Sequence, residues 1–177
     1  MSVISTVEVM PNRIALVHRF LRMHADPLPE KTLLQLLSPP EIRKKPAAVP
    51  KPEEEKPGAV APAVVRECKA LGLIADAGGD QVCLAEDANM DIRVFLEQRL
   101  LHPEEAERCR QANVPYALAW FLCQDPASPL LLRHNQKDRV ESDTGGKTLD
   151  LTNKDRFRHF GFWVRYLGLG WWLRGSG

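Results

Sequence analysis

A stretch of twenty residues, from Pro39 to Gly58, limits what this chain can fold into more than any other part of the sequence. It reads PPEIRKKPAAVPKPEEEKPG, in which six residues are proline, nine are charged and almost none is bulky and apolar. Such a composition buries too little apolar surface to offset the entropy of ordering the chain. We therefore predict an exposed, largely disordered linker over residues 39–58, with ordered structure on both sides.

Two short amphipathic helices are predicted before the linker. Apolar residues recur at spacings of three and four between Ile14 and Leu21, which predicts a helix over residues 11–23. Four leucines within EKTLLQLL predict a second helix over residues 30–37. The apolar start of the chain, Val3 to Val9, predicts a strand.

A helix followed by a β-hairpin is predicted directly after the linker. Residues 61–72 carry a helical apolar stripe that ends at Gly72, and residues 73–75 and 81–85 have the pattern of two strands around the tight turn 77–80. Helix, strand, turn and returning strand together make a wing. One core is expected to join these elements, and its predicted members are Phe20, Leu34, Val65, Leu71 and Val82.

Three further helices are predicted, over residues 91–101, 103–123 and 153–167, with the second one broken at Pro115. The sequence FWVRYLGLGWWLRG near the end repeats the pattern of ECKALGLIADAGG, a helix that ends in L-G-L and leads into a strand. We expect a mainly α chain of the α+β class, and the closing GSG is consistent with a fragment of a longer protein. Its expected parts are residues 1–86 as a winged helix, 87–125 as a helical segment and 126–177 as a partial second winged-helix-like unit.

Composition narrows the class of protein. The 24 Lys and Arg residues nearly balance the 23 Asp and Glu residues, so attraction to nucleic acid requires a local patch. No apolar run is long enough for a transmembrane helix, and the first residues lack the features of a signal peptide. The four cysteines have no metal-site or disulfide spacing and are interpreted as thiols in a reducing compartment. These features predict a cytoplasmic, soluble protein with no membrane partner.

No motif for catalysis, a metal or a cofactor emerges from the sequence. Residues 145–148 read GGKT. A phosphate-binding loop, G-x-x-x-x-G-K-[ST], would need a glycine five residues before Gly146, but that position is Glu141. A plain turn is therefore predicted there. The five histidines lie on separate segments without metal-ligand spacing, and we interpret them as surface or capping residues. Pairs such as Cys109 with His102 lack an orienting third group, so the chain is predicted not to be an enzyme.

The segment VVRECKALGLIADAGGDQVCLAE, with the two helices before it, resembles the winged helix-turn-helix domains of bacterial regulators. More broadly, the chain is similar to accessory proteins of the bacterial clusters that put 7-deazaguanine into DNA, or of neighbouring phage-defence islands. The first resemblance implies a recognition helix over residues 61–72, with Arg66 and Lys69 as its DNA-contacting cations. The implied wing carries Asp76 and Asp80 where such wings usually have basic residues.

Charge is segregated along the chain. Residues 11–51 have a net charge of +5, residues 52–125 of −7 and residues 126–177 of +4. In the last predicted helix, Arg156, Arg158 and Arg165 are the candidates for phosphate contact or for contact with an acidic protein. The sequence thus predicts a non-enzymatic DNA-binding accessory protein, possible partners being double-stranded DNA and other proteins of a complex. The alternative is a protein–protein scaffold that uses a winged-helix fold without DNA contact.

Overall fold

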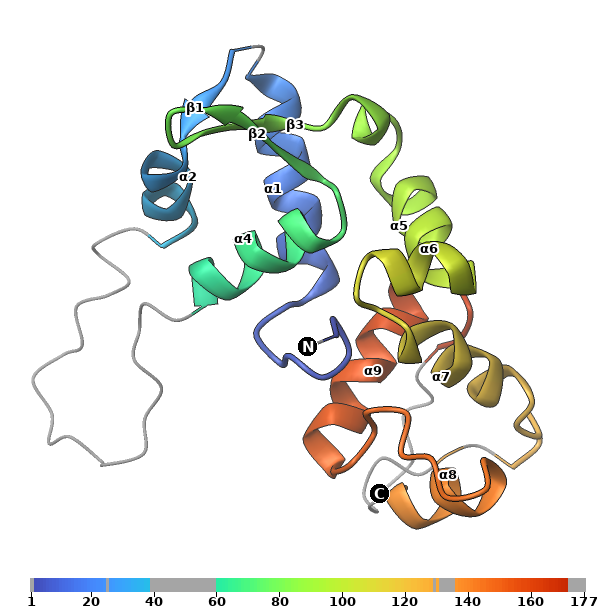
Figure 1. The fold of residues 1–177 in the computed structure, drawn as a ribbon. Helices are drawn as coiled ribbons and strands as arrows, with labels where there is room; N and C mark the ends of the chain where they lie inside the picture. The colour runs from blue at the N-terminus through green and yellow to red at the C-terminus, as the bar shows by residue number, and fades with distance from the viewer. Residues whose placement is uncertain (1, 25, 39–59, 129, 131–135, 172–177) are drawn as a thin grey trace, which may run out of the picture. The chain divides into compact units, whose positions relative to one another are not determined.

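The computed structural model describes residues 2–24, 26–38, 60–128, 130 and 136–171 (Figure 1). Contacts divide the chain into two compact units. The first, called the wing unit here, comprises residues 12–89. The second, called the helical unit, comprises residues 1–11 and 90–177. The linker predicted over residues 39–58 lies outside the described residues.

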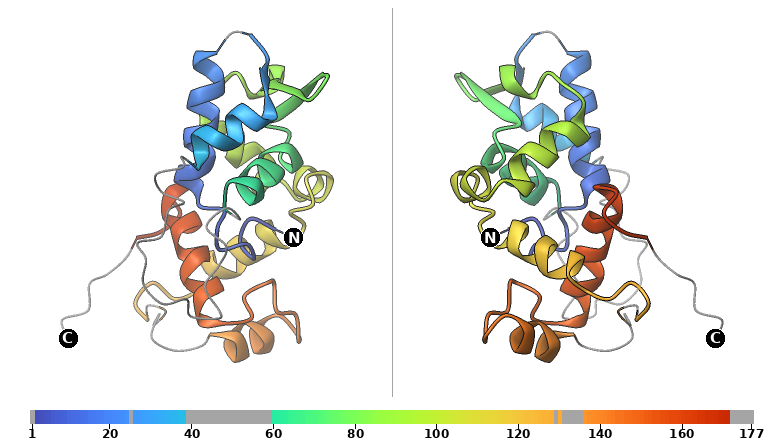
Figure 2. Two further views of the ribbon diagram at one scale, coloured as in Figure 1. Left: turned by 90° about the vertical axis from the view of Figure 1, so that its left-hand side faces the viewer. Right: turned by 90° about the vertical axis from the view of Figure 1, so that its right-hand side faces the viewer.

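The described residues of the wing unit form three helices beside a small sheet (Figures 1 and 2). In chain order its elements are α1 (Pro11–Met23), β1 (Leu28–Pro29), α2 (Glu30–Leu37), α4 (Val60–Ala70), β2 (Ile74–Gly78), β3 (Gln81–Leu84) and the 3-10 turn η1 (Glu86–Ala88). The sheet is antiparallel in the order β1-β3-β2, with Leu28 opposite Val82 and Ile74 opposite Leu84. This mostly helical fold with a three-stranded antiparallel sheet confirms the α+β, winged-helix-like prediction.

The hairpin turn of the wing is formed by residues that adopt left-handed backbone conformations. Gly78, Gly79 and Asp80 have φ values of 87°, 57° and 62°, and the pairing shifts register between Asp76 and Gly78. Glycine tolerates such φ values without a steric penalty, which is why the Gly-Gly-Asp sequence closes the hairpin here. The predicted turn and both strands of the wing are therefore confirmed.

Three of the five predicted core residues are buried. Val65, Leu71 and Val82 are almost completely inaccessible, whereas Phe20 and Leu34 are only half-buried. The reason for Phe20 is the helical period: the buried side of α1 presents Ile14, Val17, His18 and Leu21, and residue 20 falls outside that arc. The prediction that Phe20 and Leu34 belong to the core was wrong.

The helical unit contains α5 (Ile92–Leu101), α6 (Pro103–Arg108), α7 (Asn113–Leu122), α8 (Lys137–Asp143) and α9 (Lys154–Tyr166). Helix α5 begins where the sequence indicated, because the Asp91 carboxylate accepts the backbone N–H groups of Arg93 and Val94. The parts predicted as separate, 87–125 and 126–177, contribute to this one unit, which also includes residues 2–11.

The first residues of the chain pack into the helical unit as turns. Val3, Ile4 and Val9 are fully buried. The Val3 N–H donates to Gln111 Oε1 at 2.7 Å, and His159 Nε2 donates to the Val3 carbonyl at 2.7 Å. The N–H groups of Ser5 and Thr6 donate to the Ser2 carbonyl. Because turn bonds and buried side chains satisfy these backbone groups, no strand partner is needed, and the strand predicted over residues 3–9 is wrong.

The break predicted at Pro115 lies earlier in the chain. Helix α6 ends at Arg108, Arg110 has a φ of 60°, and α7 already contains Pro115 in its first turn. Proline is tolerated there because the first N–H groups of a helix have no helical partner to lose.

The interpretation of all five histidines as surface or capping residues also needs correction, since His18 and His159 are buried and hydrogen-bonded to backbone carbonyls.

The two L-G-L segments end their helices in the same way. Gly72 and Gly168 have φ values of 73° and 72°. In both cases the residue after the glycine donates its N–H five residues back, Leu73 to Cys68 and Leu169 to Val164, at 2.9 Å. This is the Schellman arrangement. The repeat thus extends to the helix cap, but residues 169–171 form no strand and residues 172–177 lie outside the described part.

Candidate nucleic-acid interface

Helix α9 is fixed in the helical unit by an aromatic face. Phe157, Phe160 and Trp163 are buried, and the first two make edge-on contacts with Trp120 and Phe121 of α7 at 6.2 and 6.0 Å between ring centroids. At the start of the helix, the Asn153 side chain accepts the N–H of Arg156 at 2.9 Å. The aromatic residues predicted on this helix are therefore core, and the opposite face of α9 carries the polar residues.

Three cations form a row on that opposite face. Lys154, Arg158 and Arg165 lie within about 40° of one another around the helix axis and span roughly 16 Å along it, at 100° and 1.5 Å per residue. All three are exposed, and the side chain of neither arginine makes an ion pair or hydrogen bond with another described residue. Phe162, 37% exposed, lies on the same side. We call these residues the α9 basic face; Lys154 was missed in the sequence although its spacing of four from Arg158 signals it.

Arg156 does not belong to this face. It lies about 160° from Lys154 around the axis, by the same helical period. Its side chain is partly buried, and Nη1 donates to Thr152 Oγ1 at 3.2 Å. Of the three arginines predicted to act together on this helix, the structure brings together Arg158 and Arg165 only.

The two cations predicted on the recognition helix contact carboxylates of their own unit. Lys69 Nζ donates to Asp76 Oδ1 and to Glu30 Oε2, both at 2.8 Å. The hydrogen bonds with Asp76 and with Glu30 raise the pKa of the Lys69 ammonium above its ordinary value. Arg66, although exposed, forms an ion pair with the buried Glu67 at 3.2 Å. Helix α4 therefore presents largely compensated charge.

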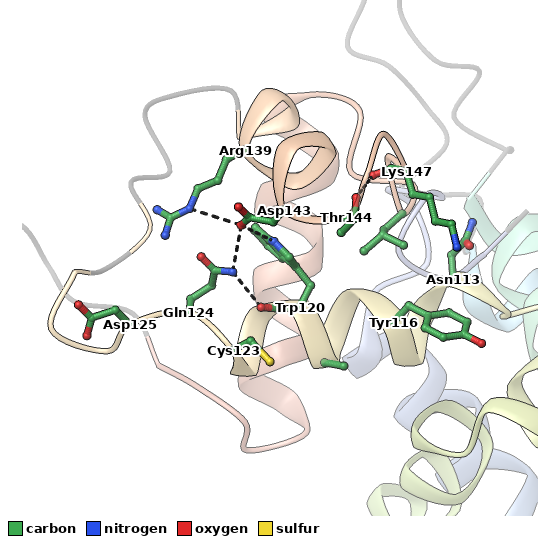
Figure 3. Close-up of a pocket in the computed structure, with 12 residues that line it drawn as sticks. Asn113, Tyr116, Trp120, Cys123, Gln124, Asp125, Arg139, Asp143, Thr144 and Lys147 are labelled. Carbon is green, nitrogen blue, oxygen red and sulfur yellow. Dashed lines mark hydrogen bonds and ion pairs between the residues drawn. The ribbon is translucent and has the colours of Figure 1, made fainter.

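A shallow groove of about 850 Å³ lies between α7 and α8 in the helical unit (Figure 3). Its polar centre is the Asp143 carboxylate, whose Oδ2 accepts from Trp120 Nε1 at 2.9 Å and from Gln124 Nε2 at 3.4 Å, with Arg139 Nε 3.9 Å away. Cys123 also lines the groove, but no histidine is among the described residues around it. The groove therefore presents a compensated carboxylate and no described nucleophile–base pair.

Residues 145–148 follow α8 as a turn, as predicted. Gly145 and Gly146 have φ values of 67° and 93°, and the Gly146 N–H donates to the Glu141 carbonyl at 2.7 Å. That N–H group is occupied by the helix end, so it cannot cradle a phosphate.

Among the described residues no group of three or more His, Cys, Asp or Glu side chains could hold a metal ion. No helix in the described ranges has the length and apolar character needed to span a bilayer.

Comparison with known proteins identifies the family. A family model described as DpdG-like matches residues 1–174. The chain belongs to the DpdG-like family. This membership supports the link to the 7-deazaguanine DNA-modification clusters that the sequence resemblance indicated. No curated protein and no solved structure matches the chain.

Proposed function

We propose that this protein is a non-enzymatic accessory protein of a bacterial DNA-modification system and that it binds double-stranded DNA through the α9 basic face. The observation that carries the proposal is the row of exposed cations, in which Arg158 and Arg165 have no carboxylate partner among the described residues. Membership of the DpdG-like family supports the setting in a DNA-modification system.

The chemistry of the α9 basic face suits phosphate contact rather than sequence readout. Arginine and lysine neutralise phosphates and release counterions, which gives affinity that does not depend on sequence. The exposed residues between Lys154 and Arg165 on this side include no Asn or Gln, the side chains that read adenine edges. We therefore expect non-specific duplex binding that positions the protein on DNA.

A salt titration of binding to random duplex DNA tests the proposal. Replacing Arg158 and Arg165 together by alanine removes up to two phosphate contacts, so the slope of log affinity against log salt should flatten by up to about 1.8. Arg156→Ala is the matched control on the same helix, and it should leave the slope unchanged. An unchanged slope in the double variant, or no duplex binding by the unmodified chain at low salt, would contradict DNA contact through α9.

A scaffold without DNA contact is the second candidate, and helix α4 favours it. Lys69 already engages two carboxylates, and the wing tip carries Asp76 and Asp80. A recognition helix whose cations already pair with carboxylates offers little attraction to phosphate. If the salt titration detects no DNA binding, this candidate remains.

A further inference from the structure

The outer face of α1 carries an exposed apolar stripe. Leu16 and Met23 are 56% and 76% exposed, and Phe20 lies half-buried between them. Their spacing of four and then three residues places all three within about 60° around the helix axis. The Phe20 ring packs against His24 at 4.3 Å between centroids, which fixes its orientation on this face.

The same helix buries a different set of apolar side chains on its inner face. Ile14, Val17 and Leu21 are buried in the wing unit and account for the packing of α1. The outer stripe is therefore not needed to hold the helix in place. A contiguous run of exposed large apolar side chains on one helix face is characteristic of an interaction site.

Positive charge flanks the stripe. Arg13 lies on one side of it and Arg19 on the other, and α1 has the sequence PNRIALVHRFLRM, which contains three arginines and no acidic residue. A basic rim around an apolar centre is complementary to a surface with acidic groups around apolar anchors.

We propose that the outer face of α1, comprising Leu16, Phe20 and Met23, docks an amphipathic helix of a partner protein whose apolar residues are flanked by Asp or Glu. The spacing of the stripe matches the i, i+4, i+7 anchors of helix-to-helix docking, and methionine adapts its shape to a partner side chain. A second copy of this chain is a poorer occupant, because pairing two such faces would oppose arginines to arginines. This contact is separate from DNA binding by α9, and its test can fail while the DNA test succeeds.

Binding of two synthetic helical peptides to the full chain, measured by fluorescence anisotropy, tests this docking surface. Both peptides carry leucines at i, i+4 and i+7; one has glutamates flanking them and the other has lysines. We expect the glutamate peptide to bind at least roughly tenfold more tightly than the lysine peptide. Leu16→Ala with Met23→Ala should weaken its binding by at least roughly the same factor, as expected for apolar anchors.

The matched control is Leu122→Ala, because Leu122 is an equally exposed leucine, 57% accessible, on α7. It should leave peptide affinity unchanged, and near-identical thermal unfolding of all variants should establish that they fold. Equal binding of both peptides, retained binding by the Leu16 and Met23 double variant, or no binding at all would overturn the proposal. Self-association that is lost with the double variant would also overturn it, in favour of a second copy.

Discussion

Lys69 illustrates how a single residue changes its role once the chain has folded. In sequence it is a cation on a predicted recognition helix, but its partner Glu30 lies 39 positions earlier, across the linker. No local pattern links these two residues, since the contact requires α2 and α4 to pack together in the wing unit. The charge of Lys69 follows from the sequence alone, whereas the two carboxylates that compensate it depend on the folded structure.

Replacing Lys69 by methionine should therefore affect stability more than DNA binding. Because the ion pairs are partly exposed, we expect a loss of no more than about 1 kcal/mol in the free energy of unfolding. The salt slope of DNA binding should stay unchanged. Chemical denaturation followed by circular dichroism, together with the duplex titration, measures both quantities; a flattened slope with unaltered stability would show that Lys69 contacts DNA.

The difference in free energy of unfolding between the unmodified chain and Lys69→Met should depend on pH with a defined sign. The Lys69 pKa is raised in the folded protein above its ordinary value of 10.5, so the ammonium form is favoured by folding. Its stabilising contribution should be complete below pH 10.5 and disappear as the pH rises through the higher native pKa. Unfolding of the unmodified chain and of Lys69→Met should therefore converge at strongly alkaline pH; a constant difference between them would contradict the ion-pair assignment.

At the scale of helices and strands, the sequence predicted helix bounds correctly where local patterns set them. The ends of α1, α2, α5 and α9 follow from apolar spacing, capping side chains and glycine. It failed where tertiary contacts decide, as in the turns of residues 2–10, which bond to Gln111 and His159. Helix α8 was missed because its sequence KDRVESD offers only Val140 as a buried apolar residue. The row on α9 could have been extended to Lys154 from the helical period alone.

The end of α9 provides a test of such local structure. Gly168 has a φ of 72°, and a Cβ there would collide with the guanidinium of Arg93, which donates from Nη2 to the Leu167 carbonyl at 2.9 Å. We expect Gly168→Ala to destabilise the protein by about 1–3 kcal/mol from backbone strain, plus the displacement of Arg93. Gly145→Ala is the control, with a φ of 67° but open space around its Cβ. Equal losses in urea unfolding would mean that the Arg93 contact contributes nothing.

On the scale of the whole molecule, the N-terminal residues connect distant parts of the sequence. Val3 and His159 are 156 positions apart and share a buried hydrogen bond within the helical unit. The sequence-based boundaries, after residues 86 and 125, placed residues 1–10 with the winged helix, because such boundaries depend on neighbours along the chain. Only the contacts show that these residues complete the other core.

Ile4→Ala should therefore destabilise the helical unit. Ile4 is fully buried, and removing such a side chain typically costs about 2–5 kcal/mol. All four tryptophans of the chain lie between positions 120 and 172, so tryptophan fluorescence follows the unfolding of this unit. Val7→Ala, at a 47% exposed neighbouring position, should leave the transition in place. If both variants unfold alike, residues 2–10 do not complete this core.

The buried hydrogen bond between Val3 and His159 affects the order in which the protein can fold as it is synthesised. All residues of the wing unit have left the ribosome once residue 89 emerges, but Val3 and Ile4 have no complete core until the segment with His159 follows. At a synthesis rate of roughly 5–20 residues per second, these apolar side chains would wait several seconds without their partners. During that interval Val3 and Ile4 remain available to a chaperone or to another nascent chain.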